Sequence, residues 1–318
     1  MKFYTSVLPY RGRLLVRGVD KDGTQKKYRI NYKPSLFVPV GKETKYKTLD
    51  GRYVERIKFD SMPEATKWVN EYKNVTNFEY FGNTRHQYPF IADEFKGKIK
   101  WDINKIKILT VDIECESENG FPSPEKADQP LICITVKDHI SKKIIVFGIG
   151  SFVNDREDVQ YIDCVTEQGL VETFTKFWVE YNPDIITGWN VKFFDIPYLM
   201  NRFRYLMGDD WLNQFSPWGI VEQKSAAVLF ASREQQVWNI MGVDTLDYLD
   251  LYRKFTFVRR ESYKLDYIGE VELGQNKLEN PYDTFKEFYQ NDYQRFVEYN
   301  IQDVELVDKL EDKMQLIA

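Results

Sequence analysis

The chain has 318 residues, of which 43% are apolar and 29% charged, a composition typical of globular proteins. This length predicts about two domains. No apolar run approaches the ~18 residues of a membrane span, and the first residues lack the long apolar segment of a secretory signal. The three cysteines have neither metal-site nor disulfide spacing, which suggests a reducing compartment, and the two histidines argue against most zinc sites.

Charge divides the sequence into two parts. Residues 1–105 hold 22 Lys and Arg against 12 Asp and Glu, a net charge of +10, whereas residues 106–318 hold 22 against 37, a net charge of −15. The basic part is suited to phosphate backbones, although a solvated lysine-rich surface explains it equally well. We place the domain boundary in the basic connector 96–105, between a domain over 1–103 and a domain over 104–318.

The first domain is predicted to be small and α+β. Residues 1–40 alternate between apolar and polar side chains, with turn signals at Pro9 and Gly12, which predicts short antiparallel strands joined by hairpins. Ser61 is a predicted N-cap, and the apolar residues after it recur at helical spacing as far as Tyr72.

The second domain is organised around residues 106–114, an apolar, β-branched run that predicts a buried strand ending in two acids. Strands in succession, followed by strands that alternate with helices, predict a layered α/β domain with a mixed sheet. The other predicted strands lie over 131–136, 143–147 and 184–189. Helices are predicted over 170–181, from about 194, and over 284–314 with a break near 291. A projecting hairpin is predicted over 221–241, with strands at 228–230 and 237–240 that flank a polar turn at 232–235.

Acidic residues stand at three positions where they can meet. Asp112 and Glu114 point to the same side of their strand and repel each other, and a divalent cation between them would offset the repulsion. A solvated strand end is the ordinary alternative for this pair alone. Asp195 stands at a strand-to-helix turn, where an acid also stabilises a helix N-terminus. Tyr299 and Asp303 share a helix face, and a solvated acid beside a core tyrosine explains that pair as well.

The order of these residues resembles the three motifs of the DEDD exonucleases, in their tyrosine variant. The pattern is Asp-x-Glu on a strand, Asn-x-x-x-Phe-Asp over 190–195, and Tyr-x-x-x-Asp on a late helix. The surroundings at 187–190, 198–202, 215–217 and 246–252 are similar to the proofreading region of B-family DNA polymerases, in particular those of T-even-like bacteriophages. The resemblance implies an RNase H-like exonuclease domain after the small α+β domain.

The resemblance also implies a role for each acid. Mg²⁺ would bind as two ions, for which Mn²⁺ can substitute, on the carboxylates of Asp112, Glu114, Asp195 and Asp303. Tyr299 would orient the attacking water. Carboxylate oxygens suit such hard cations, and the ions offset the repulsion between hydroxide and an anionic phosphodiester.

Four further residues are expected to contact DNA. The resemblance places Asn190 on the substrate side of the second motif and Lys277 near the site. Phe121 and Phe194 would lie against the terminal bases of a frayed strand, because aromatic stacking tolerates any base. The hairpin over 221–241 resembles the strand-separating hairpin of the family.

The implied function is proofreading, the hydrolysis of single-stranded DNA from its 3′ end, in the cytoplasm of an infected bacterium and away from membranes. The polymerase motifs of the family are absent from this chain. We therefore expect it to be one part of a polymerase, with primer-template DNA, a separate polymerase chain and a sliding clamp as partners. The alternatives are a DEDD-type RNase, an RNA-binding translational repressor module that uses the basic N-terminal part, and a docking scaffold.

Overall fold

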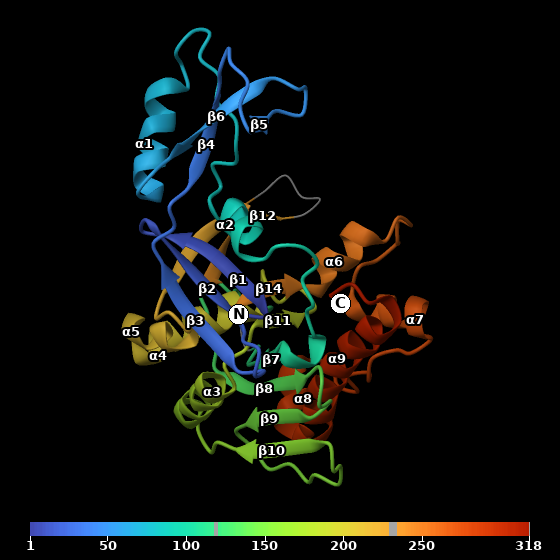
Figure 1. The fold of residues 1–318 in the computed structure, drawn as a ribbon. Coiled ribbons are helices and arrows are strands. Elements are labelled where there is room, and N and C mark those ends of the chain that lie inside the picture. The colour runs from blue at the N-terminus through green and yellow to red at the C-terminus, as the bar shows by residue number, and fades with distance from the viewer. Residues whose placement is uncertain (118–119, 229–233, 318) are drawn as a thin grey trace. The chain divides into compact units, whose positions relative to one another are not determined.

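The computed structural model describes residues 1–117, 120–228 and 234–317 (Figure 1). The chain divides into two compact units, Met1–Lys105 and Ile106–Ala318. Within the described residues, no helix is both long and apolar enough to cross a membrane.

The first unit contains two small antiparallel sheets, which confirms the predicted α+β class. Its elements are β1 (Phe3–Tyr10), β2 (Arg13–Val19) and β3 (Gln25–Ile30) in one sheet, β4 (Ser35–Pro39), β6 (Tyr53–Lys58) and β5 (Tyr46–Lys47) in the other, the helices α1 (Met62–Tyr72) and α2 (Gln87–Glu94), and the short η1 (Ile103–Lys105). The predicted N-cap is confirmed, because the Ser61 hydroxyl accepts a hydrogen bond from the Glu64 N–H at 3.2 Å.

The second unit is built on a mixed six-stranded sheet, as the sequence predicts. The strands, in spatial order, are β10 (Val159–Asp163), β9 (Ile144–Gly148), β8 (Leu131–Asp138), β7 (Ile108–Cys115), β11 (Ile185–Gly188) and β14 (Asp244–Asp247). β8 pairs antiparallel with β7 and β9, whereas β11 pairs parallel with β7 and β14. The two-residue period of β7 therefore sends its side chains alternately to two different helical layers.

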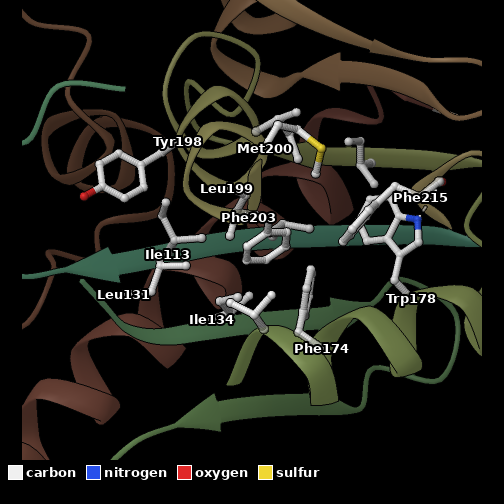
Figure 2. Packing of buried hydrophobic residues seen from close by; sticks show 14 of the residues in the cluster. Ile113, Leu131, Ile134, Phe174, Trp178, Tyr198, Leu199, Met200, Phe203 and Phe215 are labelled. Atoms are coloured by element: carbon white, nitrogen blue, oxygen red, sulfur yellow. Dashed lines mark hydrogen bonds between the residues drawn. The ribbon is translucent and has the colours of Figure 1, made fainter. Parts of the chain in front are cut away.

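One layer is an aromatic core formed by α3 (Glu167–Tyr181) and α4 (Asp195–Met207) against the sheet. Figure 2 shows Phe174 and Trp178 of α3 close to Phe203 of α4 and to Phe215. The ring centroid of Trp178 lies 5.9 Å from the ring centroid of Phe174 and 5.3 Å from that of Phe215. Ile113 of β7 packs into this core, so its two neighbours in the strand must face the other layer.

That other layer consists of α8 (Phe285–Asn291) and α9 (Tyr293–Met314), which pack against β8 and β9. The predicted break near residue 291 is confirmed, since Asp292 separates the two helices and caps the Arg295 N–H. Thr284 and Glu287 form a capping box at the start of α8.

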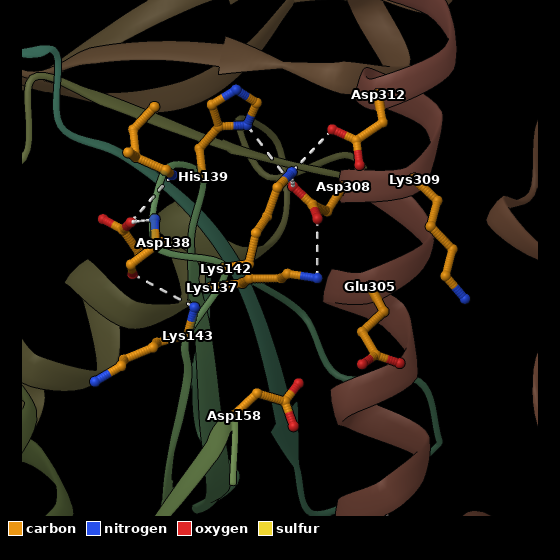
Figure 3. A network of polar contacts seen from close by, with 12 residues as sticks. Lys137, Asp138, His139, Lys142, Lys143, Asp158, Glu305, Asp308, Lys309 and Asp312 are labelled. Carbon is orange, nitrogen blue, oxygen red and sulfur yellow. Dashed lines mark hydrogen bonds and ion pairs between the residues drawn. The ribbon is translucent and has the colours of Figure 1, made fainter. Parts of the chain in front are cut away.

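An ion-pair network holds the middle of α9 against the β8–β9 turn (Figure 3). Asp308, only 4% exposed, lies 2.9 Å from the Lys137 Nζ and 2.8 Å from the Lys142 Nζ. Burial opposes charge on this carboxyl, but hydrogen bonds from His139 and the two lysines lower its pKa below the ordinary range. The pairs fix α9 along its axis, and with it the residues near its start.

The remaining elements include one correction to the predictions. They are α5 (Asp209–Leu212), η2 (Asn213–Phe215), β12 (Val221–Ala227), β13 (Glu234–Ile240), α6 (Tyr248–Phe255) and α7 (Leu265–Leu273). The predicted hairpin exists, but its described first strand, β12, lies before the predicted run at 228–230. Glu234 and Gln235, which were predicted as part of the turn, belong to β13. Pairing of the polar β12 with β13 overrides the weak β-propensity of β12. The predicted positions 229–233 lie outside the described residues.

Candidate active site

Three acids meet where the end of β7 faces α9. Asp112 and Glu114 project from the side of β7 opposite Ile113, and Asp303 projects from α9, where it is 5% exposed. One carboxylate oxygen from each of the three lies within 4.8 Å of the others. The strand period and the helix position together produce this cluster, as the sequence predicts for the pair on β7.

Asn300 connects the acids to the sheet, and sequence reasoning assigned it no role. This fully buried side chain donates a hydrogen bond to the Asp112 carboxylate at 2.5 Å. Its amide oxygen accepts from the Thr135 hydroxyl on β8. A polar residue beside Tyr299 on an otherwise apolar helix face was the available signal, because buried amides are rarely left without partners.

Asp195 reaches the same place from α4. It is the first residue of that helix and is 3% exposed, and its Oδ1 accepts a hydrogen bond from the Ile113 N–H at 3.2 Å. This bond joins the start of α4 to β7 between the two strand acids. Among the described residues, Asp195 is not part of the tight carboxylate cluster.

The turn before α4 depends on a second residue that sequence reasoning did not assign. The Asp247 carboxylate accepts hydrogen bonds from the Asn190 N–H at 3.2 Å and the Lys192 N–H at 2.9 Å. Asn190 has a φ of +66°, a left-handed conformation that asparagine tolerates better than most residues. Asp247 therefore orients the turn that carries Asn190 and leads into Asp195.

Lys277 provides positive charge beside the acids. Its Nζ forms an ion pair with Asp303 and donates a hydrogen bond to the Tyr299 hydroxyl oxygen at 3.0 Å. Burial disfavours the ammonium, but Asp303, Tyr299 and Asp112 together raise the pKa of Lys277 above its ordinary value. The lysine stays charged and offsets part of the negative charge.

The acids remain poorly compensated despite this lysine. Burial first, then Asp303, raises the pKa of Asp112 and of Glu114 well above their ordinary values. Burial also raises the pKa of Asp195 to about 8, against the hydrogen bonds it accepts. Removal from water disfavours each charged form, and neighbouring charges of the same sign add to the effect.

All nine residues predicted from the sequence line one cavity of 860 Å³. They are Asp112, Glu114, Phe121, Asn190, Phe194, Asp195, Lys277, Tyr299 and Asp303. Trp189, Lys264, Leu265, Asp266 and Phe285 also line it, and no prediction named them. These last residues lie between the motifs, and only the path of the chain brings them to the cavity.

Two aromatic rings stand at this cavity. Phe121 is 87% exposed, and its ring centroid lies 5.3 Å from that of Phe194. Helix α4 holds the loop of Phe121: Tyr198 donates to the Gln129 carbonyl at 2.6 Å, and Asn201 to the Pro124 carbonyl at 2.7 Å. The helix that begins with Asp195 therefore also positions the exposed ring.

Most of the chain matches a known protein family. Residues 64–268 match the model of the DNA polymerase family B exonuclease domain. The chain belongs to this family. It is 31% identical to the DNA-directed DNA polymerase of Escherichia phage RB69, over 99% of this chain and 38% of the relative. It is 30% identical to that of Enterobacteria phage T4, over 98% of this chain and 37% of the relative.

Eukaryotic relatives cover less of the chain. The DNA polymerase delta catalytic subunit of Caenorhabditis elegans is 29% identical over 68% of this chain and 21% of the relative. The chain spans little more than a third of the two phage polymerases. Its family is confirmed as predicted, and the domain it shares with them is a nuclease domain of family B.

The residues at the cavity fit a divalent cation. Within the described part of the chain, the Asp303 Oδ1 is buried and has no hydrogen-bond partner. A buried carboxylate oxygen without a partner is costly. A cation between Asp303, Asp112 and Glu114 would satisfy that oxygen and reduce the repulsion, and oxygen ligands suit Mg²⁺ or Mn²⁺.

The raised carboxyl pKa values predict how the stability of the protein without metal depends on pH. The folded state keeps protons on these acids that the unfolded chain releases, so their contribution to stability is complete below about pH 4 and falls as pH rises toward 8. A change of about 1 kcal/mol in the free energy of unfolding moves the Tm of such a domain by roughly 2–4 °C. We therefore expect the Tm in EDTA to fall by roughly 5 °C or more between pH 5 and pH 8. Differential scanning calorimetry at each pH measures this fall in Tm.

Controls isolate the acids that cause this fall. Asp112→Ala with Glu114→Ala should flatten the decline, whereas Asp209→Ala with Asp210→Ala, an exposed acid pair, should retain it. Mn²⁺ should reverse the trend, since a metal ligand must first lose its proton. Equal pH profiles for wild type and the Asp112/Glu114 variant would contradict this account.

Proposed function

We propose that this chain is the proofreading part of a DNA polymerase and hydrolyses single-stranded DNA from the 3′ end. One observation carries the proposal: the carboxylate cluster of Asp112, Glu114 and Asp303 lies in the same cavity as the ring pair Phe121 and Phe194. Acids of this kind suit metal-assisted phosphodiester hydrolysis, and a ring pair of which Phe121 is exposed suits an unpaired base.

The metal in this proposal is Mg²⁺, bound as two ions, with Mn²⁺ able to substitute. Asp112, Glu114, Asp195 and Asp303 are the proposed ligands, and the partnerless oxygen of Asp303 supports that assignment. When bound, such ions lower the pKa of an attacking water and stabilise the departing 3′ oxygen. Lys277 adds a fixed positive charge beside Asp303.

Tyr299 is the proposed orienting group for the attacking water. Burial raises its pKa to about 12, so it is a neutral phenol at physiological pH. Lys277, which can only donate, occupies a lone pair of its oxygen. The phenol proton is therefore directed to some other acceptor, and a water at the carboxylates or a phosphate oxygen suits that role.

The aromatic pair is the proposed binding surface for the terminal base. Stacking on Phe121 and Phe194 gives affinity for every base, as a proofreading enzyme requires, because every base has a π-face. Asn190, which precedes Phe194 in the same turn and lines the cavity, would steady the substrate side of the second motif. A polymerase chain, a sliding clamp, RNA at residues 1–105, and the infected bacterial cytoplasm remain predictions.

The first test compares digestion of one oligonucleotide labelled at either end. With Mg²⁺, the 3′ label should be released at once as a mononucleotide, whereas the 5′ label should pass through a ladder of shorter products. EDTA should stop both reactions. Asp112→Ala with Glu114→Ala should lower the rate at least about 100-fold, because it removes charge stabilisation at the reacting phosphate.

Two comparisons complete this test. Asp209→Ala with Asp210→Ala should cleave at the wild-type rate, since both acids are exposed on a different helix. Faster cleavage of an all-ribose oligonucleotide would favour a DEDD-type RNase. Early release of the 5′ label, or half the wild-type rate in the Asp112/Glu114 variant, would contradict the proposal.

The second test separates the water-orienting group from the metal ligand. Tyr299→Phe removes only a hydroxyl, and we expect a fall in single-turnover rate of roughly 10–1,000-fold with little change in Mn²⁺ affinity. Asp303→Asn should weaken Mn²⁺ binding as well, because it removes a ligand charge. Calorimetric titration beside rapid-quench kinetics measures both. Tyr205→Phe, an exposed tyrosine, is the matched control. The assignments would be reversed if Tyr299→Phe lost metal and Asp303→Asn retained it.

A further inference from the structure

The segment 253–260, which comprises the end of α6 and the first part of the connection to α7, differs from the rest of its unit. Its sequence is Arg-Lys-Phe-Thr-Phe-Val-Arg-Arg, four cations and three large apolar residues without an acid. The unit that contains it has 37 acidic against 22 basic residues over 106–318. A local basic run in an acidic unit indicates a specific partner of negative charge.

The apolar residues of this segment are exposed. Phe257 is 97% exposed, Val258 59% and Phe255 50%. The Lys254 ammonium lies 5.4 Å from the centroid of the Phe255 ring. Basic side chains interleaved with exposed rings are the combination that binds single-stranded nucleic acid, through phosphate contacts and base stacking.

The segment is held in place at its base while its tip is exposed. Arg260 donates to the Tyr252 hydroxyl at 2.9 Å and pairs with Glu272 at 2.6 Å. The guanidinium of Arg253 lies 4.5 Å above the ring of Tyr263. These contacts fix both ends of the segment, so Phe257 is presented on an ordered frame.

The base of the segment adjoins the wall of the cavity. The Tyr263 carbonyl accepts a hydrogen bond from the Trp189 indole at 3.0 Å, and Trp189 and Lys264 line the cavity. Phe257 is seven residues from Lys264 in the sequence. A fully extended chain of seven residues spans at most about 25 Å, so the two residues are no farther apart than that. A stacked strand advances about 3.4 Å per nucleotide, so the segment is within roughly seven nucleotides of the cavity.

We propose that residues 253–260 form a second DNA contact, which binds the strand several nucleotides from the 3′ end held in the cavity. Phe257 stacks on a base, and Lys254 and Arg259 contact phosphates. The inference rests on the proposed function for the position of the 3′ end. It adds a site that none of the exonuclease motifs contains, and it predicts that the affinity for DNA depends on strand length.

The test uses oligothymidylates of 20 and 4 nucleotides, labelled at the 5′ end, with the full chain. Binding is measured by fluorescence anisotropy in EDTA, where no cleavage occurs. Phe257→Ala with Arg259→Gln should raise the Kd for the 20-mer about tenfold and reduce its salt slope by about 0.7, the value for one phosphate contact. The Kd for the 4-mer should not change, because the proposal places this contact beyond the fourth nucleotide from the 3′ end.

A matched control carries the same kinds of change on another helix. Lys176→Gln with Val179→Ala replaces an exposed cation and an exposed apolar side chain on α3, and it should leave both affinities at wild-type values. With Mg²⁺, the Phe257/Arg259 variant should show a raised KM for the 20-mer, an unchanged kcat, and unchanged cleavage of the 4-mer. Equal Tm values confirm that each variant is folded.

The outcomes separate this inference from the proposed function. An unchanged Kd for the 20-mer, or an equal loss of affinity for both lengths, would overturn the second DNA contact and assign the exposed rings to a protein partner. A chain that binds the 20-mer through this segment yet cleaves neither oligonucleotide in Mg²⁺ would support the contact and contradict the exonuclease proposal.

Discussion

Repulsion among closely spaced carboxylates is the constraint on which the second unit depends. The aromatic core holds Ile113 on one face of β7, so Asp112 and Glu114 are forced to the other face, against Asp303 of α9. Lys277 and Asn300 compensate only part of the charge. Without a bound cation, such a cluster lowers the free energy of unfolding. Apolar residues of similar volume could replace the acids with little loss of stability. The cations that we propose for this site would account for its retention by the surrounding fold.

Rigidity on both sides of the sheet makes the cluster possible. On one side, α4 begins at Asp195, binds the Ile113 N–H and also holds the loop of Phe121. On the other side, the Asp308 ion pairs fix α9 about two and a half turns beyond Tyr299 and about one and a half turns beyond Asp303. Carboxylates that repel one another would move apart on flexible elements. Here they stay together because the helices and the strand that carry them are packed independently of the site.

The sequence predicted those parts that depend on local pattern. The apolar run ending at Glu114 identified the central strand, and the turn before Asp195 and the break at Asp292 were found from composition alone. The parts that depend on chain path were not predicted. The hydrogen bonds of Asp247 to the turn before α4 and the bond from Asn300 to Asp112 join residues far apart in the sequence. Helices α6 and α7 were also not predicted. The hairpin strand β12 was misplaced because pairing, not hydrophobic pattern, determines it.

Electron paramagnetic resonance of bound Mn²⁺ tests the central claim most directly, because it reports whether two ions lie close together on these acids. We expect the wild-type chain to bind two Mn²⁺ ions at neutral pH and to give the spectrum of an exchange-coupled pair. Asp112→Ala with Glu114→Ala should abolish that spectrum, while Asp209→Ala with Asp210→Ala should preserve it. Uncoupled Mn²⁺ with the same weak affinity in all three proteins would contradict the claim that the carboxylate cluster is a metal centre.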